Sequence, residues 1–389
     1  MFPVIDAEGS ALVRGRIHGT LARSRIERSI ATYARLFAYC GIDWGDAQRR
    51  AARYRDTVGH LDSELLEEIE GIAAGAGRGF EEILALNART EILPPSYPGE
   101  ASPHWQQVQE LNRGAGIPDW GECTALAVQP ARSATRGTLL AQNWDWLGMQ
   151  REAVVLIRSR ESDGSSCLAF TEAGMLAKIG LNEHGLGVCL SLMRSRRDGA
   201  HPGVPVHVLL RALLKRSTVG EAIELASGLT HGGSSNVLCA DRDGEAVSLE
   251  LSPDSVEVVR PEDGIACHTN HFLMPTGLAG EAPRAPTLST EQRLKRILAL
   301  ATAHRQSIGI GDLQTMLRDE SEGLMSICRH PDPQLPREAR VETVASILMD
   351  LAQGVMHVAP DVPTKVAYHA VPLRKAVDAP VQRSSAMSS

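Results

Sequence analysis

The sequence predicts a layered α+β protein in which a helical N-terminal part is followed by strands, helices and further strands. Residues 20–97 show the three-to-four-residue apolar spacing of amphipathic helices. From Cys123 onward, short apolar or alternating runs typical of strands are separated by turn residues. No GxGxxG or P-loop pattern follows a strand, so hairpin-joined layers are favoured over a βαβ nucleotide fold.

The helical prediction comes from three stretches. In ARSRIERSIATYARLFAYCGIDW a single stripe is formed by apolar side chains, namely Ile26, Ile30, Tyr33, Leu36 and Phe37. LDSELLEEIEGIAAGAG and GFEEILALNARTEIL continue the same spacing. Residues 98–120 are rich in glycine, proline and polar groups without a sustained period, which predicts an exposed connection.

The strand prediction starts with CTALAVQP, GTLLAQNWDW, AVVLIRSR and SCLAFTEAG. Residues 176–193 contain two strands around an Asn-Glu-His-Gly turn, and residues 205–229 return to a helical period. Further strands are expected over residues 234–261 and in GIACHTNH, helices over residues 289–318, and last strands in ARVETVASILMDL and GVMHVAP. The tail from about residue 376 is expected to be disordered.

Composition narrows the class of function. The 389 residues, 43% of them hydrophobic, suffice for a large core and for two or three domains. A net charge of −7 and 4% aromatic residues disfavour nucleic-acid binding. The N-terminus lacks a signal-peptide pattern, and no apolar run has the length of a membrane span. Seven scattered cysteines without CxxC favour reduced thiols in the cytoplasm over disulfides or a zinc site.

Cys123, in the stretch GECTALAV, is the candidate nucleophile. It follows a polar Gly-Glu pair and opens an apolar strand. A thiol attacks as a thiolate, so it needs a base or positively charged surroundings, and no Ser/His/Asp pattern lies near it in the sequence. The pattern alone leaves two alternatives open, a buried strand cysteine and a nucleophile that is exposed when the chain is cut before it.

Five separated segments carry a family resemblance. CTALAVQPARSATRGTLLAQNWDW, with its Cys-Thr start and Asn-Trp-Asp strand, resembles the nucleophile region of the acyl-coenzyme A:6-aminopenicillanic acid acyltransferase family, which is peptidase family C45 of the N-terminal nucleophile hydrolases. The other similar segments, in the family's order, are TEAGMLAKIGLNEHGLGVCLSLM, CHTNHF, SICR and ARVET. The resemblance covers roughly residues 20–375.

The resemblance implies the four-layer αββα sandwich of N-terminal nucleophile hydrolases, preceded by a helical segment. It also implies self-cleavage between Glu122 and Cys123, after which the α-amino group of Cys123, with a reference pKa of about 8, acts as the base. By the same resemblance Asp145 orients that amine, Asn270 stabilises the oxyanion, and Arg340 pairs with Asp145 or with a substrate carboxylate.

Structural interpretations stand beside these roles. Asp145 could be a strand-end carboxylate and Arg340 a solvated strand arginine. Asn143, on the strand face of Asp145, could support the site or cap a turn. His268 and His271 are expected to be structural, because their spacing lacks the features of a zinc motif.

Two charged residues near the signature segments are also expected to be structural. Glu172 is expected in a turn, where it accepts backbone N–H bonds. Arg293 is expected on a helix surface after a Ser-Thr cap.

Two positions depart from the family pattern. Glu122 stands where the family often has glycine, and because glycine tolerates backbone strain better, Glu122 could slow self-cleavage or help to move protons. Ala339 stands where the family has a serine, which weakens the case for a penicillin substrate.

The sequence therefore predicts a helical α-segment over residues 1–122, a catalytic segment over 123–375 that folds with it as one unit, and a disordered tail over 376–389. The predicted function is acyl transfer or amide hydrolysis through an acyl-Cys123 intermediate. The alternatives are an amidase that makes no use of coenzyme A and a non-catalytic binding protein on the same fold.

No cofactor or metal is expected, although acyl-coenzyme A could be a substrate. The expected partners are a small acyl amide or thioester and, after processing, the second fragment of the same chain in an α/β heterodimer. Neither nucleic acid nor a membrane is expected as a partner.

Overall fold

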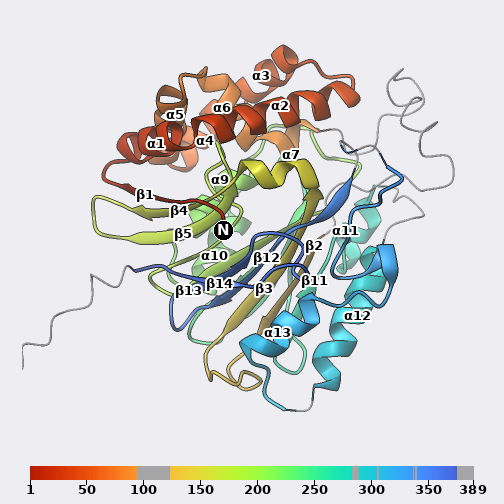
Figure 1. The fold of residues 1–389 in the computed structure, drawn as a ribbon. Coiled ribbons are helices and arrows are strands. Elements are labelled where there is room, and N and C mark those ends of the chain that lie inside the picture. Colours follow the sequence, from red (N-terminus) through yellow and green to blue (C-terminus); the bar gives the residue numbers. More distant parts are fainter. Residues whose placement is uncertain (94–122, 283–288, 305, 336, 338–339, 375–389) are drawn as a thin grey trace, which may run out of the picture.

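The computed structural model describes residues 1–93, 123–282, 289–304, 306–335, 337 and 340–374 (Figure 1). The predicted connection at 98–120, Glu122, Ala339 and the predicted disordered tail all lie outside the described residues. The predicted helical part begins earlier than expected, at Ala11. Its helices are α1 (Ala11–Leu21), α2 (Arg23–Tyr39), α3 (Trp44–Ala52), α4 (Arg55–Leu61), α5 (Ser63–Ala76), α6 (Phe80–Asn87) and α7 (Arg89–Ile92).

A short strand that was not predicted from the sequence precedes these helices. This strand, β1 (Val4–Glu8), pairs in parallel with β4 (Val154–Arg160), with Val4 opposite Leu156. The N-terminal segment is thereby hydrogen-bonded to a strand that follows Cys123 in the chain.

The strands form two sheets, as the family resemblance implied. The larger sheet has the order β1-β4-β5-β6-β7-β8-β9-β10, and the smaller has the order β11-β2-β3-β12-β13-β14. Apart from the β1–β4 pair, neighbouring strands are antiparallel. The remaining bounds are β2 (Cys123–Val128), β3 (Leu139–Leu147), β5 (Ser166–Glu172), β6 (Ile179–Asn182), β7 (Gly187–Leu192), β8 (Ser235–Ala240), β9 (Ala246–Leu251), β10 (Val256–Val259), β11 (Ile265–His268), β12 (Val341–Asp350), β13 (Val355–Ala359) and β14 (His369–Pro372).

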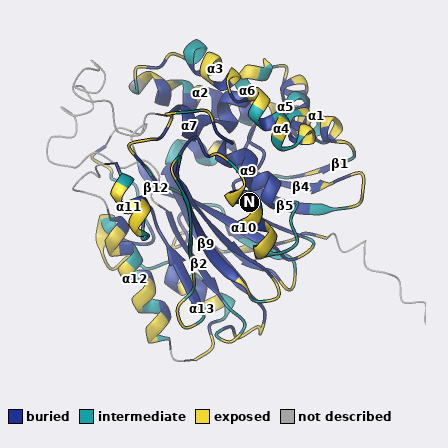
Figure 2. Ribbon diagram, turned by 180° about the vertical axis from the view of Figure 1, so that it is seen from behind, coloured by how far each residue is buried: buried dark blue, intermediate teal, exposed yellow. Residues whose placement is uncertain are grey.

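The two sheets pack face to face between layers of helices. Strands β2 and β3 contact β7, and β11 contacts β9. Helices α2 and α10 cover the larger sheet, whereas α12 and α13 cover the smaller one (Figure 1). The strands are mostly buried, and exposed residues gather on the outer helices (Figure 2). The predicted αββα fold class is confirmed.

The later helices and turns also follow the prediction in part. The helical region at 205–229 divides into α9 (Val206–Leu213) and α10 (Val219–Ser227), and that at 289–318 into α12 (Thr290–Ala303) and α13 (Ile310–Leu317). The short helices α11 (Pro275–Gly280), η1 (Gly148–Ala153) and η2 (Gly323–Met325) connect strands and helices, and β14 is an additional strand that was not predicted.

Strand β2 is buried on both faces, which explains its unbroken apolar run. Ala125 and Ala127 face the core between the sheets, whereas Leu126 and Val128 face the core beneath α12 and α13. Cys123 belongs to the core between the sheets. The start of β2 therefore places a thiol between the two sheets and the next side chain, Thr124, toward α12.

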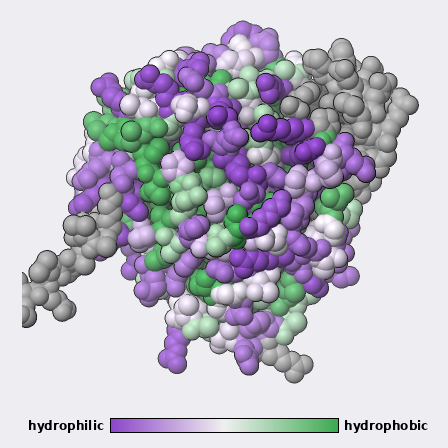
Figure 3. Space-filling view, viewed as in Figure 1, coloured by the Kyte–Doolittle hydropathy of each residue, from purple (hydrophilic) through white to green (hydrophobic). Residues whose placement is uncertain are grey.

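Among the described residues, no helix combines the length and apolar character needed to cross a bilayer. Large hydrophobic side chains are exposed on α1, at Leu12, Val13 and Leu21 (Figure 3).

Candidate active site

Cys123 opens β2 opposite Trp144 of β3 and is 3% exposed. Its backbone N–H donates to Oδ1 of Asn270 over 2.6 Å. Burial, followed by the nearby Asp145 carboxylate, raises the pKa of the thiol to about 11, while a backbone hydrogen bond from Asp145 and the charges of Arg293 and Lys178 act in the opposite direction. A thiol with this pKa is protonated at neutral pH, so its attack on a carbonyl requires a base.

Asn270 lies just after β11 and is held from several sides. Its Oδ1 accepts hydrogen bonds from Cys123 and from Nη2 of Arg293, the latter over 3.0 Å. Its Nδ2 donates to the carbonyl of Leu192 over 2.9 Å, and its backbone N–H donates to Oγ1 of Thr290 over 2.8 Å. The structure thus brings the predicted amide to Cys123, and these hydrogen bonds fix the orientation of the amide.

Arg293 is the arginine of this site, and its predicted position on a helix surface is wrong. The side chain is fully buried, and its guanidinium donates to the carbonyl of Cys123 and, over 2.9 Å, to Oγ1 of Thr124. Nε donates to Oγ of Ser289 over 2.8 Å, so the predicted cap serine bonds this side chain instead. One cation therefore joins α12, the start of β2 and Asn270.

Asp145 is fully buried in β3, on the strand face opposite to that of Trp144. Oγ1 of Thr343 donates to its Oδ1 over 2.7 Å, and Oδ2 has no hydrogen-bond partner among the described residues. Burial raises the pKa of Asp145 to about 7, although Arg293 and the Thr343 hydrogen bond lower it. In the intact chain the Cys123 N–H is bonded to Asn270. The hydrogen bond between Asp145 and the amine freed by cleavage stays a prediction.

Asn143 lies on the same face as Asp145, as the period-two pattern predicted. Its Nδ2 donates to the carbonyls of Leu317 and Ile327, over 2.8 and 2.9 Å. It therefore fastens the segment after α13 onto β3 and does not cap a turn.

Arg340 does not pair with Asp145, so this expectation is corrected. Its Nε and Nη2 donate to the carbonyls of Leu335 and Pro333, over 2.8 and 3.0 Å. The residue precedes β12, and the cross-strand partner of Asp145 is Thr343, three positions further along. The Arg340 side chain turns back onto its own preceding loop.

Glu172 is buried at the end of β5, and its predicted turn role with backbone N–H bonds is wrong. Its carboxylate pairs with the ammonium of Lys178 and accepts hydrogen bonds from the Tyr33 hydroxyl and from Nε2 of Gln150. Nη2 of Arg89 lies 3.8 Å from Oε2. Burial alone would raise the pKa of Glu172, but Lys178 and Arg89 outweigh it and lower the pKa to about 2.

Lys178 lies between this group and Cys123, the candidate nucleophile. Its Nζ lies 4.1 Å from the ring centroid of Trp144, the cross-strand neighbour of Cys123. Burial lowers the pKa of Lys178 to about 8, and the Glu172 carboxylate opposes this effect. A buried cation therefore lies on the inner face of the smaller sheet, near Cys123.

The two histidines of CHTNHF make structural hydrogen bonds. His268 bonds Oε1 of Glu250 through Nε2 over 2.8 Å, and His271 bonds Oγ1 of Thr290 through Nδ1 over 2.8 Å. Their donors are used within the fold around Asn270, in agreement with the structural interpretation.

Arg293 and Lys178 were not predicted as site residues, although the sequence around each contains a feature that indicates a buried charge. Arg293, Ile297 and Ala301 recur every four residues and are all buried, so the arginine lies on the apolar stripe of α12. Lys178 lies within the apolar run MLAKIG, where a charged side chain is costly unless it is paired.

Comparison with known proteins identifies the family. The family model described as acyl-coenzyme A:6-aminopenicillanic acid acyl-transferase matches residues 132–365, more than half of the chain. The chain belongs to this family. Cys123 and Thr124 lie just before the residues that the acyltransferase family model matches.

Several known proteins are similar to this chain. The 40 kDa form of acyl-coenzyme A:6-aminopenicillanic-acid-acyltransferase from Emericella nidulans is 26% identical over 336 residues, which are 84% of each chain. Among solved structures, a mutant conjugated bile acid hydrolase from Clostridium perfringens aligns with a TM-score of 0.47 and 15% identity, covering 64% of this chain and 92% of its own. Penicillin V acylase from Agrobacterium tumefaciens aligns with a TM-score of 0.43 and 14% identity, covering 61% and 83%.

Proposed function

We propose that this member of the acyltransferase family transfers or hydrolyses an acyl group through an acyl-Cys123 intermediate, after cutting its own chain between Glu122 and Cys123. The observation that carries the proposal is the surroundings of the Cys123 thiol. The charged groups that act on it are a carboxylate, a guanidinium and an ammonium already paired with Glu172. The α-amino group that cleavage would release at Cys123 is a base of suitable pKa on the same residue as the thiol.

The self-cleavage step forms and breaks one bond at each stage. The Cys123 sulfur attacks the carbonyl carbon of Glu122, and the bond to the Cys123 nitrogen breaks as that nitrogen takes up the thiol proton. Water then hydrolyses the resulting thioester, which leaves a carboxylate on Glu122 and a free thiol and amine on Cys123. Asn270 and Arg293 hold the nitrogen and the carbonyl of Cys123 by hydrogen bonds, which supports a fixed position of Cys123 during this step.

In the acyl-transfer step, the neutral amine of Cys123 accepts the thiol proton and the thiolate attacks the acyl carbonyl. The amide of Asn270 lies beside the attacking residue, where an N–H donor would stabilise the oxyanion. The unpartnered Oδ2 of Asp145 supports its role as the acceptor that orients the freed amine. The leaving amine or thiolate departs with a proton, and water or an amine then takes the acyl group from Cys123.

We propose a small acyl amide or thioester as the substrate, with acyl-coenzyme A as a candidate donor. The name of the Emericella nidulans relative includes both acyl-coenzyme A and a penicillin nucleus. Transfer and hydrolysis differ only in the acceptor that reacts with the acyl-Cys123 intermediate.

The two fragments are proposed to remain together after cleavage, as residues 1–122 and 123–389. Strand β1 pairs with β4, and Tyr33 donates to the Glu172 carboxylate, so both sides of the cut share one sheet and one buried charge cluster.

Intact-protein mass spectrometry tests the proposal. We expect the purified wild type to contain the two fragments, and Cys123→Ala to remain one chain. Cys267→Ala, which removes a buried thiol from the neighbouring strand β11, serves as the control and should be cut like the wild type. Brief exposure of processed protein to an acyl substrate should add the acyl mass to the fragment that starts at Cys123.

Two outcomes would contradict the proposal. Cleavage that persists in Cys123→Ala would indicate an outside protease. An uncut wild type whose thiol never takes up an acyl group would instead favour the non-catalytic binding protein.

A further inference from the structure

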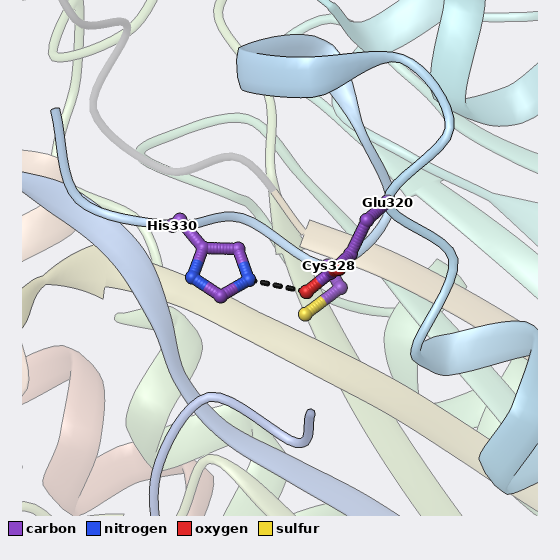
Figure 4. A group of neighbouring side chains, drawn as sticks. All are labelled: Glu320, Cys328 and His330. Carbon is purple, nitrogen blue, oxygen red and sulfur yellow. Dashed lines mark hydrogen bonds and ion pairs between the residues drawn. The ribbon is translucent and has the colours of Figure 1, made fainter. Parts of the chain in front are cut away.

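A second group of reactive side chains lies apart from Cys123, in the segment between α13 and β12. Glu320, Cys328 and His330 each offer one metal-ligand atom, and these three atoms lie within 4.8 Å of one another. Figure 4 shows the imidazole and the carboxylate pointing toward each other, with the Cys328 sulfur beside them. None of the three residues has a role in the acyl transfer proposed above.

The distances within this group suit a small cation. Nε2 of His330 bonds Oε1 of Glu320, and Oγ1 of Thr364 lies 3.3 Å from the same nitrogen and 3.9 Å from the Cys328 sulfur. Ligand atoms around a tetrahedral ion with bonds of about 2.0–2.3 Å are roughly 3–4 Å apart. Small side-chain rotations would therefore bring the three atoms onto one ion.

The set of donors selects a class of metal. A thiolate with an imidazole and a carboxylate suits Zn²⁺ and similar first-row ions, whereas Mg²⁺ and Ca²⁺ prefer oxygen ligands alone. Cys328 is fully buried, while the side chains of His330 and Glu320 are 38% and 47% exposed. The ion can thus enter from solvent and bind a sulfur that is shielded on its other side.

We propose that Glu320, Cys328 and His330 bind one Zn²⁺-class divalent cation per chain, with the fourth position left to water or Thr364. On binding, the thiol proton of Cys328 passes to solvent and the hydrogen bond between His330 and Glu320 is replaced by bonds to the ion.

The site is connected to Asp145 through the backbone. The N–H of Arg329 donates to Oγ1 of Thr343 over 2.9 Å, and its carbonyl accepts from the Thr343 N–H over 3.0 Å. The same Thr343 hydroxyl donates to Asp145. An ion bound by the residues on either side of Arg329 would therefore fix the segment that positions Asp145.

Co²⁺ titration followed by absorption spectroscopy tests the proposal. The full-length Cys123→Ala chain is used, because it cannot present the free amine and thiol of a processed Cys123 as a competing chelate. We expect one Co²⁺ per chain, a thiolate-to-cobalt charge-transfer band, intense visible bands of a tetrahedral site, and loss of both on addition of Zn²⁺. A titration without a thiolate band would overturn the proposal.

Ligand variants locate the site. Loss of a residue that only hydrogen-bonds a metal ligand typically lowers metal affinity about 10–100-fold. Cys328→Ser, His330→Ala and Glu320→Gln change the ligands themselves and should each weaken binding at least as much. His304→Ala is the control, because His304 also bonds a carboxylate, that of Asp312 at 3.2 Å, outside the proposed site.

His330 and Glu320 are partly exposed, so their variants keep the test valid even if Cys328→Ser folds poorly. Unchanged Co²⁺ affinity in His330→Ala and Glu320→Gln would place the ion elsewhere and overturn the proposal.

Discussion

Two buried groups of charged side chains lie on opposite faces of the smaller sheet, and they differ in the parts of the chain that build them. On the outer face, Arg293 binds Cys123, Thr124 and Asn270, all of which follow the proposed cleavage point. On the inner face, the Glu172–Lys178 pair is completed by Tyr33 and Arg89, which precede it.

The two groups therefore differ in which segments must be folded for each group to form. The outer group needs only correct folding of the segment that begins at Cys123. The inner group also needs the helical segment to stay in place, because Glu172 is fully buried and loses two of its partners without that segment. Variants on each face can test this division.

The largest effect is expected for Arg293→Met. It removes the donor from several buried acceptors, each costing roughly 1–3 kcal/mol in the free energy of unfolding. It also frees Asn270, and a misplacement of about 1 Å can cost about 10²-fold in turnover. Urea unfolding, the cleaved fraction and turnover should all fall.

Arg296→Met provides the matched control from the same helix. Arg296 pairs with Asp319 and is 35% exposed, so its loss should cost about 1 kcal/mol or less. Equal losses in the two variants would show that Arg293 has no special relation to the site.

A smaller effect is expected for Lys178→Met, which keeps the volume of the side chain. Removing one partner of a buried ion pair costs about 3–5 kcal/mol, and the neighbouring Arg89 should reduce this loss. The variant also lacks the ammonium that lowers the pKa of Cys123, so iodoacetamide labelling of that thiol should require a higher pH. A labelling profile identical to that of the wild type would show that Lys178 does not influence the pKa of the Cys123 thiol.

Asp145→Asn should move the same labelling profile in the opposite direction. The carboxylate raises the pKa of the Cys123 thiol, so its removal should allow labelling at lower pH. The folded-state pKa of Asp145, about 7, lies above its ordinary value of 3.8. Wild-type stability should therefore fall as pH rises from about 4 to 7, and the Asn variant should lack this decrease.

Asp198→Asn is the control for this pH profile. Burial likewise raises the pKa of Asp198, to about 6, but Asp198 is not among the groups that act on the Cys123 thiol. Its variant should change the pH dependence of stability and leave the labelling of Cys123 unaltered. A shift of labelling in both variants would point to a general loosening of the fold.

The smallest effect is expected for Arg340→Ala. This side chain donates to two loop carbonyls, so its loss should cost about 1 kcal/mol per hydrogen bond or less and leave turnover unchanged. A loss of turnover as large as that expected for Arg293→Met would restore Arg340 to the site.

The sequence was sufficient where structure depends on local periodicity. The strands from Cys123 onward, apart from β14, and the 176–193 hairpin follow from short apolar or alternating runs. Strand β1 was missed because it has only five residues and its partner β4 lies about 150 residues away. A parallel pairing over that separation leaves no turn signal in the sequence.

The candidate site, too, could be predicted from the sequence only in part. The family resemblance predicted Cys123 and Asn270 as site residues, and the structure places them in contact. The resemblance implied Arg340 as the arginine of the site, whereas the guanidinium that contacts Cys123 and Asn270 is that of Arg293. The sequence pattern favoured a surface position for Arg293, although this residue lies on the apolar stripe of its helix. The surroundings of Glu172 could not be predicted, since Tyr33 and Gln150 reach it from distant elements.

Strand β1 has a further consequence for the solubility of the fragments. It is the edge strand of the larger sheet, and without it the apolar strand β4 would present unpaired N–H and C=O groups along a new edge. Such an edge is a template for pairing with other chains. We therefore expect the N-terminal segment to shield residues 123–375 from aggregation, and a fragment that begins at Cys123, if made alone, to associate with itself through β4.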